Sequence, residues 1–168
     1  LILACGVIVF VVMLILPYFG RHSHRPPWIV CVSNLKQIAL GERMWATDHG
    51  DKYPFQLSTN EGGTAEWLVG SQAWRQFDVL SNELNSPKVL YCPTDSHRQR
   101  ANQFSPIAGL PDRYAGNANL SYFLGIDASF ERPQQVMLGD RNLAGGNVTN
   151  GLIHLDAKSK PSFTEDLH

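Results

Sequence analysis

Apolar residues occupy almost every position from Leu1 to Leu16, and no residue before Arg21 carries a charge. This is about the length of uncharged chain that crosses the hydrocarbon core of a membrane. The residues after Leu16 do not supply the small-residue pattern at which a signal peptide is cleaved. We therefore predict a retained transmembrane helix at residues 1–20, with a buried helix of a soluble domain as the alternative interpretation.

Prolines end this apolar segment. Pro17 and the pair Pro26-Pro27 interrupt any helix that continues from it, because proline lacks an amide hydrogen and restricts the residue before it. We assign residues 21–27 to a Pro-rich break and residues 28–168 to one head. Apolar residues then recur at helical spacing up to His49-Gly50, which predicts an amphipathic helix. Its stripe comprises Trp28, Cys31, Leu35, Ile38 and Trp45, with Glu42 as the polar member.

The rest of the head alternates short apolar segments with turns. A second, shorter helix is predicted after Ser71, where apolar residues recur at helical spacing until Asn85-Ser86-Pro87. Residues 94–118 read as loop, and Gly139-Asp140-Arg141-Asn142 reads as a turn. Strands are predicted at Lys88 to Cys92, Leu120 to Ile126, Val136 to Leu138 and Leu152 to Leu155. Helices and strands without a regular βαβ alternation indicate an α+β fold with a small antiparallel sheet.

Composition narrows the range of partners. The chain has 168 residues, with 14 Lys plus Arg against 15 Asp plus Glu, and a formal net charge of −1. This balance provides no positive field for nucleic acid, so we expect no nucleic-acid partner. The head is large enough for one domain with its own core.

The charges and the cysteines give opposite indications of topology. Arg21 and Arg25 follow the apolar segment and by themselves favour a cytoplasmic location for that side. Cys31 and Cys92 are the only cysteines of the head, and such a pair suits a disulfide in an oxidising compartment. Two buried free thiols would leave the same trace in the sequence.

No motif predicts catalysis. The chain lacks a Gly-x-Ser-x-Gly elbow, a Gly-rich phosphate loop and a His-Glu-x-x-His zinc motif, so we expect no catalytic residue, cofactor or resident metal. Two weaker sets remain, and for both the favoured explanation is structural: a solvated loop for the first and turn caps for the second. One is a metal site from His22 and His24 with His49 or His97, and the other is a calcium site from Asp48, Asp51, Asp140 and Asn142. His154 and Asp156 would share one face of a strand, which is slight support for acid–base chemistry.

Several segments of the head, in this order, resemble pilin-like proteins of the type II secretion and type IV pilus class, in particular the set abundant in Verrucomicrobia and Planctomycetes. The resemblance covers nearly all of the chain from Cys31 onward. The segments are Cys31-Val32-Ser33-Asn34-Leu35-Lys36-Gln37-Ile38, Trp45 to Pro54, Ser58 to Thr64, Tyr91-Cys92-Pro93-Thr94-Asp95, Asn119-Leu120-Ser121-Tyr122-Phe123 and Gly139-Asp140-Arg141-Asn142.

The resemblance implies a pilin-like fold, in which a helix that is first hydrophobic and then amphipathic packs on a small antiparallel sheet. The apolar half, represented by Leu1, Ile8, Phe10 and Leu14, would lie in the inner membrane and later in a filament core. The expected partners are other pilin-like subunits in a homo- or hetero-oligomeric filament or secretion pseudopilus. The expected locations are a single-pass inner-membrane protein with a periplasmic head, or an extracellular filament.

The chain departs from this family in its first residues. Pilins of the class carry a glutamate at the fifth position after processing, whereas this chain has Cys5 there and no acidic residue before Glu42. Either Leu1 is not the processed terminus, or the protein is not handled as a typical pilin. The alternative function is a single-pass anchored periplasmic module, binding or enzymatic, on a pilin-like scaffold.

Overall fold

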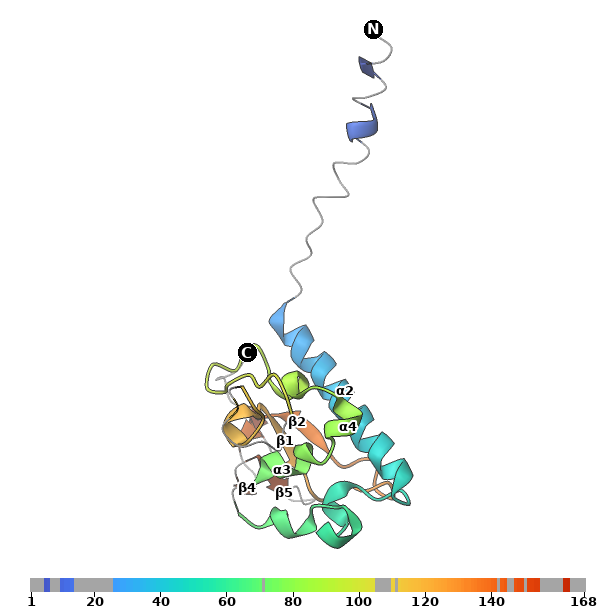
Figure 1. The fold of residues 1–168 in the computed structure, drawn as a ribbon, viewed down its shortest axis with the longest axis vertical. Coiled ribbons are helices and arrows are strands. Elements are labelled where there is room, and N and C mark those ends of the chain that lie inside the picture. The colour runs from blue at the N-terminus through green and yellow to red at the C-terminus, as the bar shows by residue number, and fades with distance from the viewer. Residues whose placement is uncertain are drawn as a thin grey trace.

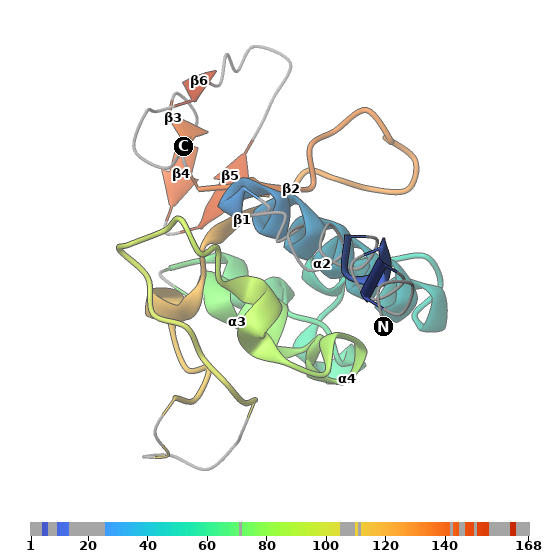
Figure 2. The ribbon, with the colours of Figure 1, turned by 90° about the horizontal axis from the view of Figure 1, so that it is seen from above.

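The computed structural model of the chain describes residues 5–6, 10–13, 26–70, 72–104, 110, 112–141, 143–144, 147–149, 151–154 and 162–163. One long helix, α2 (Pro27–Asp48), lies along a body built from short helices and a small sheet (Figure 1). Seen from above, α2 lies between the sheet and the α3–α4 region, and it contacts both strand β2 and helix α4 (Figure 2). The fold is therefore α+β, as the sequence predicts.

Helix α2 starts and ends where the sequence predicts. Pro27 occupies the first turn, where its missing amide hydrogen costs nothing, and the chain leaves the helix through His49 and Gly50, whose φ is +67°. Within the predicted stripe the buried members include Cys31, Ile38, Glu42 and Trp45. Leu35 is half-buried, and Trp28 is 53% exposed. The start of α2 extends past the other described elements of the head (Figure 1), which leaves Trp28 exposed.

Short helices connect α2 to the sheet. The single helix predicted after Ser71 is divided into α3 (Ala73–Asp78) and α4 (Ser81–Leu84), with Leu80 between them as the residue before α4. Leu80 is fully buried, so the helical apolar spacing persists although the helix is interrupted. The remaining short elements are 3-10 helices: η1 (Pro54–Gln56), η2 (Thr59–Glu61), η3 (Ala65–Leu68), η4 (Pro87–Leu90) and η5 (Asn117–Asn119).

The strand predicted at Lys88 to Cys92 is wrong, since most of this segment forms η4. Pro87 fixes φ at the first helical position, and the Ser86 hydroxyl accepts a hydrogen bond from the Lys88 amide at 3.5 Å. These local features start a helical turn although Val89 and Leu90 are typical strand residues. Leu90 is fully buried, so the apolar residues enter the core from a helical turn.

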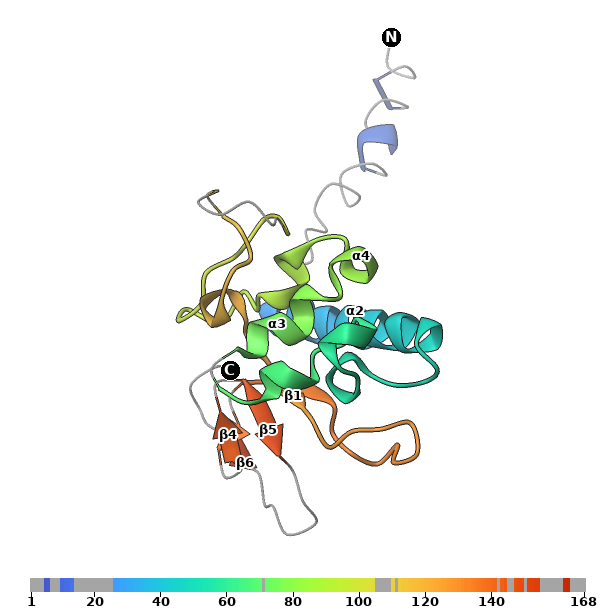
Figure 3. The same cartoon turned by 60° about the horizontal axis from the view of Figure 1, so that its bottom comes forward.

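The main sheet has four strands in the order β2-β1-β5-β4. Their bounds are β1 (Tyr122–Gly125), β2 (Leu138–Asp140), β4 (Asn147–Thr149) and β5 (Leu152–His154). Strands β1 and β2 are antiparallel, as are β4 and β5, but β1 and β5 run parallel. The predicted antiparallel pairing is thus present in β1–β2 and β4–β5 but not in β1–β5, because the β4–β5 hairpin adds β5 to the free edge of β1 in the parallel direction. Figure 3 shows β4 and β5 side by side, away from α4.

The predicted turn at Gly139 to Asn142 is also wrong in its first half. Gly139 and Asp140 belong to β2, where they pair with Phe123 and Tyr122. A Cβ atom on Gly139 would overlap the Phe123 ring, so glycine is needed here for close packing of two strands. A separate two-stranded ladder joins β3 (Leu143–Ala144) to β6 (Ser162–Phe163), and the sequence predicts neither strand.

The expected apolar helix at residues 1–20 lies mostly outside the described residues, as do Leu1, Ile8 and Leu14. Cys5, Gly6 and residues 10–13 are helical, and Phe10 is 66% exposed. Among the residues that the structure describes, no helix is both long and apolar enough to cross a membrane.

Candidate functional site

A disulfide fastens α2 to the body of the head. The Sγ atoms of Cys31 and Cys92 are 2.09 Å apart, with Cα atoms separated by 5.1 Å. The expected pairing of the two cysteines of the head is therefore present. Asp140 brings a carboxylate oxygen within 4.8 Å of both sulfur atoms, and this is the only group of metal-ligand type among the described residues. Since zinc ligation needs free thiolates, sulfurs joined in a disulfide do not provide this site.

Next to the disulfide, Asp95 and Arg141 form a two-pronged ion pair. The Arg141 Nε and Nη2 atoms donate to the two carboxylate oxygens of Asp95 at 2.6 and 2.7 Å. Asp95 is fully buried, and it also accepts a hydrogen bond from the His97 amide at 3.1 Å. Burial alone would raise the pKa of Asp95, but the hydrogen bonds and charge of Arg141 outweigh it and lower that pKa. The carboxylate thus holds the Arg141 guanidinium in one orientation.

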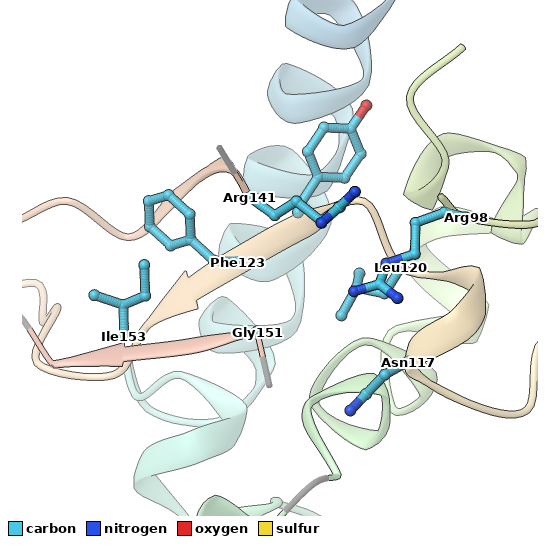
Figure 4. Close-up of a pocket in the computed structure, with 8 residues that line it drawn as sticks. Arg98, Asn117, Leu120, Phe123, Arg141, Gly151 and Ile153 are labelled. Carbon is cyan, nitrogen blue, oxygen red and sulfur yellow. The ribbon is translucent and has the colours of Figure 1, made fainter. Parts of the chain in front are cut away.

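A cavity of about 140 Å³ opens beside this pair (Figure 4). Arg98, in the loop after Asp95, and Arg141, directly after β2, reach it from different elements. Its walls are formed by Arg98, Asn117, Leu120, Tyr122, Phe123, Arg141, Gly151 and Ile153. Desolvation and the charge of Arg141 lower the pKa of the Arg98 guanidinium, while Asp95 raises it. The cavity therefore combines two guanidinium groups with an apolar wall.

A second unusual group, Glu42, is buried where α2 meets α4. Neither carboxylate oxygen of Glu42 has a hydrogen-bond partner within the described part of the chain, and the side chain is 0% exposed. Burial, and then the nearby charge of Glu83 on α4, raise the pKa of Glu42 to about 8. A carboxyl group in such surroundings is protonated at neutral pH. Glu42 was expected only as the polar member of the stripe.

Among the residues that the structure describes, the members of the two weaker metal sets do not form a metal-binding group. His49 stacks on Trp45, with ring centroids 3.6 Å apart, and its Nδ1 lies 2.7 Å from the Trp45 carbonyl oxygen. Asp48 and Asp51 are exposed near the end of α2, whereas Asp140 lies on β2 beside the disulfide. His22, His24, Asn142 and Asp156 lie outside the described residues, as does the side chain of His154.

Sequence reasoning does not single out Arg98, and it places Arg141 only in a turn. A lone arginine in a polar loop carries no spacing signal, and only the fold brings these two together. No protein-family model, no curated protein and no solved structure matches the chain. The geometry defines an α+β head, in which a disulfide joins α2 to the rest, with a small cavity lined by two arginines. These features and the sequence resemblance are the basis for proposing a function.

Proposed function

We propose that the protein is a non-enzymatic, membrane-anchored pilin-like or pseudopilin-like subunit that assembles into a filament or a secretion pseudopilus. The sequence segments between Cys31 and Asn142 that resemble pilin-like proteins support this class. The apolar segment at residues 1–16 would hold the subunit in the inner membrane and then pack in the filament core, exchanging one apolar environment for another. The head would be periplasmic before assembly, where its disulfide is stable.

One structural observation carries the assembly proposal. Five large apolar side chains of α2 remain exposed, each more than 40% accessible: Trp28, Val30, Val32, Leu40 and Met44. A soluble monomer gains nothing by exposing this much apolar surface along one helix, and such surfaces mark contacts with partners. These side chains are thus available to other subunits, while Ile38 and Trp45 of the same helix are buried in the head.

Photocrosslinking in the cells that make the protein tests this contact. A benzophenone amino acid at Leu40, which is 58% exposed on α2, should crosslink copies of this chain or other pilin-like subunits. The same group at Val69, which is 86% exposed between η3 and α3, provides the matched control. Equal crosslinking from both positions, or none from Leu40, would contradict assembly through α2.

The cavity favours a second candidate function. An anchored module that binds a small molecule would need a partly enclosed site with a few charged groups and an apolar wall, and the cavity between Arg98 and Ile153 has this character. Binding and assembly are compatible in one head, since the cavity lining includes no residue of α2.

A further inference from the structure

We propose that the cavity beside the Asp95–Arg141 ion pair binds a carboxylate carried on a short aliphatic stem. The inference is independent of assembly, because it depends only on the cavity and its lining. It assigns the head a ligand class of small organic monoacids, with Arg98 and Arg141 facing the carboxylate and the apolar wall facing the stem.

The charges around the cavity are unequal. Among the described residues two guanidinium groups, those of Arg98 and Arg141, line it and no carboxylate does, while Asp95 pairs with Arg141 beside it. Two like charges brought together and partly removed from water repel one another, and an anion between them relieves that repulsion.

Arg98 also has an unused donor. Its Nε atom is buried and has no hydrogen-bond partner among the described residues. A buried N–H group without an acceptor costs free energy that a bound acceptor recovers. A guanidinium group matches a planar carboxylate in geometry, whereas a lysine would act only as a point charge.

Arg141 is held ready for this role. Asp95, fully buried, accepts hydrogen bonds from Nε and Nη2 of Arg141 and fixes the plane of the guanidinium group. An arginine fixed in this way loses little conformational freedom when a ligand arrives, so more of the contact energy is retained as affinity. In Figure 4 the Arg98 and Arg141 side chains come from separate elements toward the start of β1.

The opposite lining is apolar and sets the size of the ligand. Leu120, Phe123 and Ile153 contribute side chains to the wall, and Gly151 contributes only backbone. A cavity of about 140 Å³ is close to the size that accommodates a benzene-sized molecule, roughly six non-hydrogen atoms. Butyrate has this size, with a carboxylate at one end and an aliphatic stem at the other.

Isothermal titration calorimetry on the full chain tests the proposal with three probes: butyrate, the neutral isostere butyramide and inorganic phosphate. We expect butyrate to bind and butyramide not to bind, because only the acid offers a charge to the two arginines. We also expect phosphate to bind more weakly, because it has no apolar part for the Leu120 and Phe123 wall. Failure of butyrate to bind at millimolar concentration, or affinity for butyramide or phosphate equal to that for butyrate, would overturn the proposal.

Variants locate the site. Arg98→Gln should weaken butyrate binding about tenfold or more, the loss expected for a charge-assisted hydrogen bond. Arg98→Lys, which keeps the charge, should retain part of the affinity and serves if the glutamine variant does not fold. Arg100→Gln changes an exposed arginine of the same loop and should bind like the unmodified chain. Unchanged affinity in both Arg98 variants would show that butyrate binds elsewhere and would refute the assignment.

Discussion

Replacing Glu42 with glutamine should remove most of the pH dependence of stability at the α2–α4 contact. Glu42 is fully buried, its oxygens have no partner among the described residues, and Glu83 lies near it on α4. Ionising this carboxyl group places an unpaired charge in the core. The glutamine side chain has nearly the same shape and never ionises, so it tests the charge alone.

The magnitude follows from the pKa of Glu42, which burial first and Glu83 second raise from 4.5 to about 8. Because the folded-state pKa is the higher one, the stabilising effect is fully present below pH 4.5 and is lost as pH rises toward about 8. At about 1.36 kcal/mol for each pKa unit, the loss over this interval is roughly 3–5 kcal/mol. This is a large fraction of the stability of a small domain.

Urea unfolding monitored by tryptophan fluorescence, below pH 4.5 and above pH 8, measures the effect. The unmodified chain should lose roughly 3–5 kcal/mol of unfolding free energy between the two conditions, and Glu42→Gln should lose much less. Two other titratable or charged groups face this region: Tyr53, whose pKa is raised by burial and then by Glu42, and Arg43 on α2. Glu61→Gln changes an exposed carboxylate and serves as the control for general charge effects. An equal pH dependence in the Glu42→Gln variant and the unmodified chain would refute the reasoning.

Three further changes test the packing of the head. Replacing Cys31 and Cys92 together with alanine should lower the free energy of unfolding by about 2–5 kcal/mol, as loss of a disulfide does in small exported domains. Mass spectrometry of thiol-blocked, unreduced protein should show the two cysteine peptides linked. Alkylation of both thiols would contradict the disulfide. Asp95→Asn removes the buried carboxylate from its arginine partner and should cost roughly 1.5–3 kcal/mol in urea unfolding, whereas an unchanged midpoint would show that the ion pair does not contribute. Gly125→Ala should cost roughly 1–3 kcal/mol in thermal unfolding, because its Cβ would overlap the Val136 carbonyl oxygen; a neutral effect would mean that β1 and the chain before β2 are not packed so closely.

The periodicity of apolar residues was sufficient to predict the long helix α2. Ile38 and Trp45 are buried on one face of α2 because a helix of this length must bury one side, and its prolines and Gly50 mark the two ends. The cysteines of the head could be paired by elimination once a compartment was assumed. Periodicity does not reveal that the first turn of α2 extends past the head, so the exposure of Trp28 could not be predicted.

The sheet shows where local patterns fail. Residues 122–125 and 152–154 were predicted as strands because they are apolar and bounded by turn residues, but which edge of β1 receives β5 depends on tertiary packing. Gly139 was read as a turn residue, whereas it lies in β2 opposite Phe123. A glycine occurs either where a turn needs its backbone freedom or where close packing leaves no room for a side chain. The sequence alone does not distinguish these two cases.

The cavity could not be predicted for a similar reason. Arg98 and Arg141 belong to a loop and to the end of a short strand, and no motif connects them in the sequence. Glu42 was visible as a polar residue in an apolar stripe. Its lack of a partner depends on α4, whose position the sequence does not give.

Assembly is the central claim, and electron microscopy of material sheared from the cells that make this protein tests it most directly, with the subunits identified by peptide mass spectrometry. The proposal predicts filaments, or short pseudopili, that contain this chain in stoichiometric amounts. Recovery of the chain only as dispersed membrane protein, with none in any filament, would contradict assembly and leave the anchored binding module as the function to pursue.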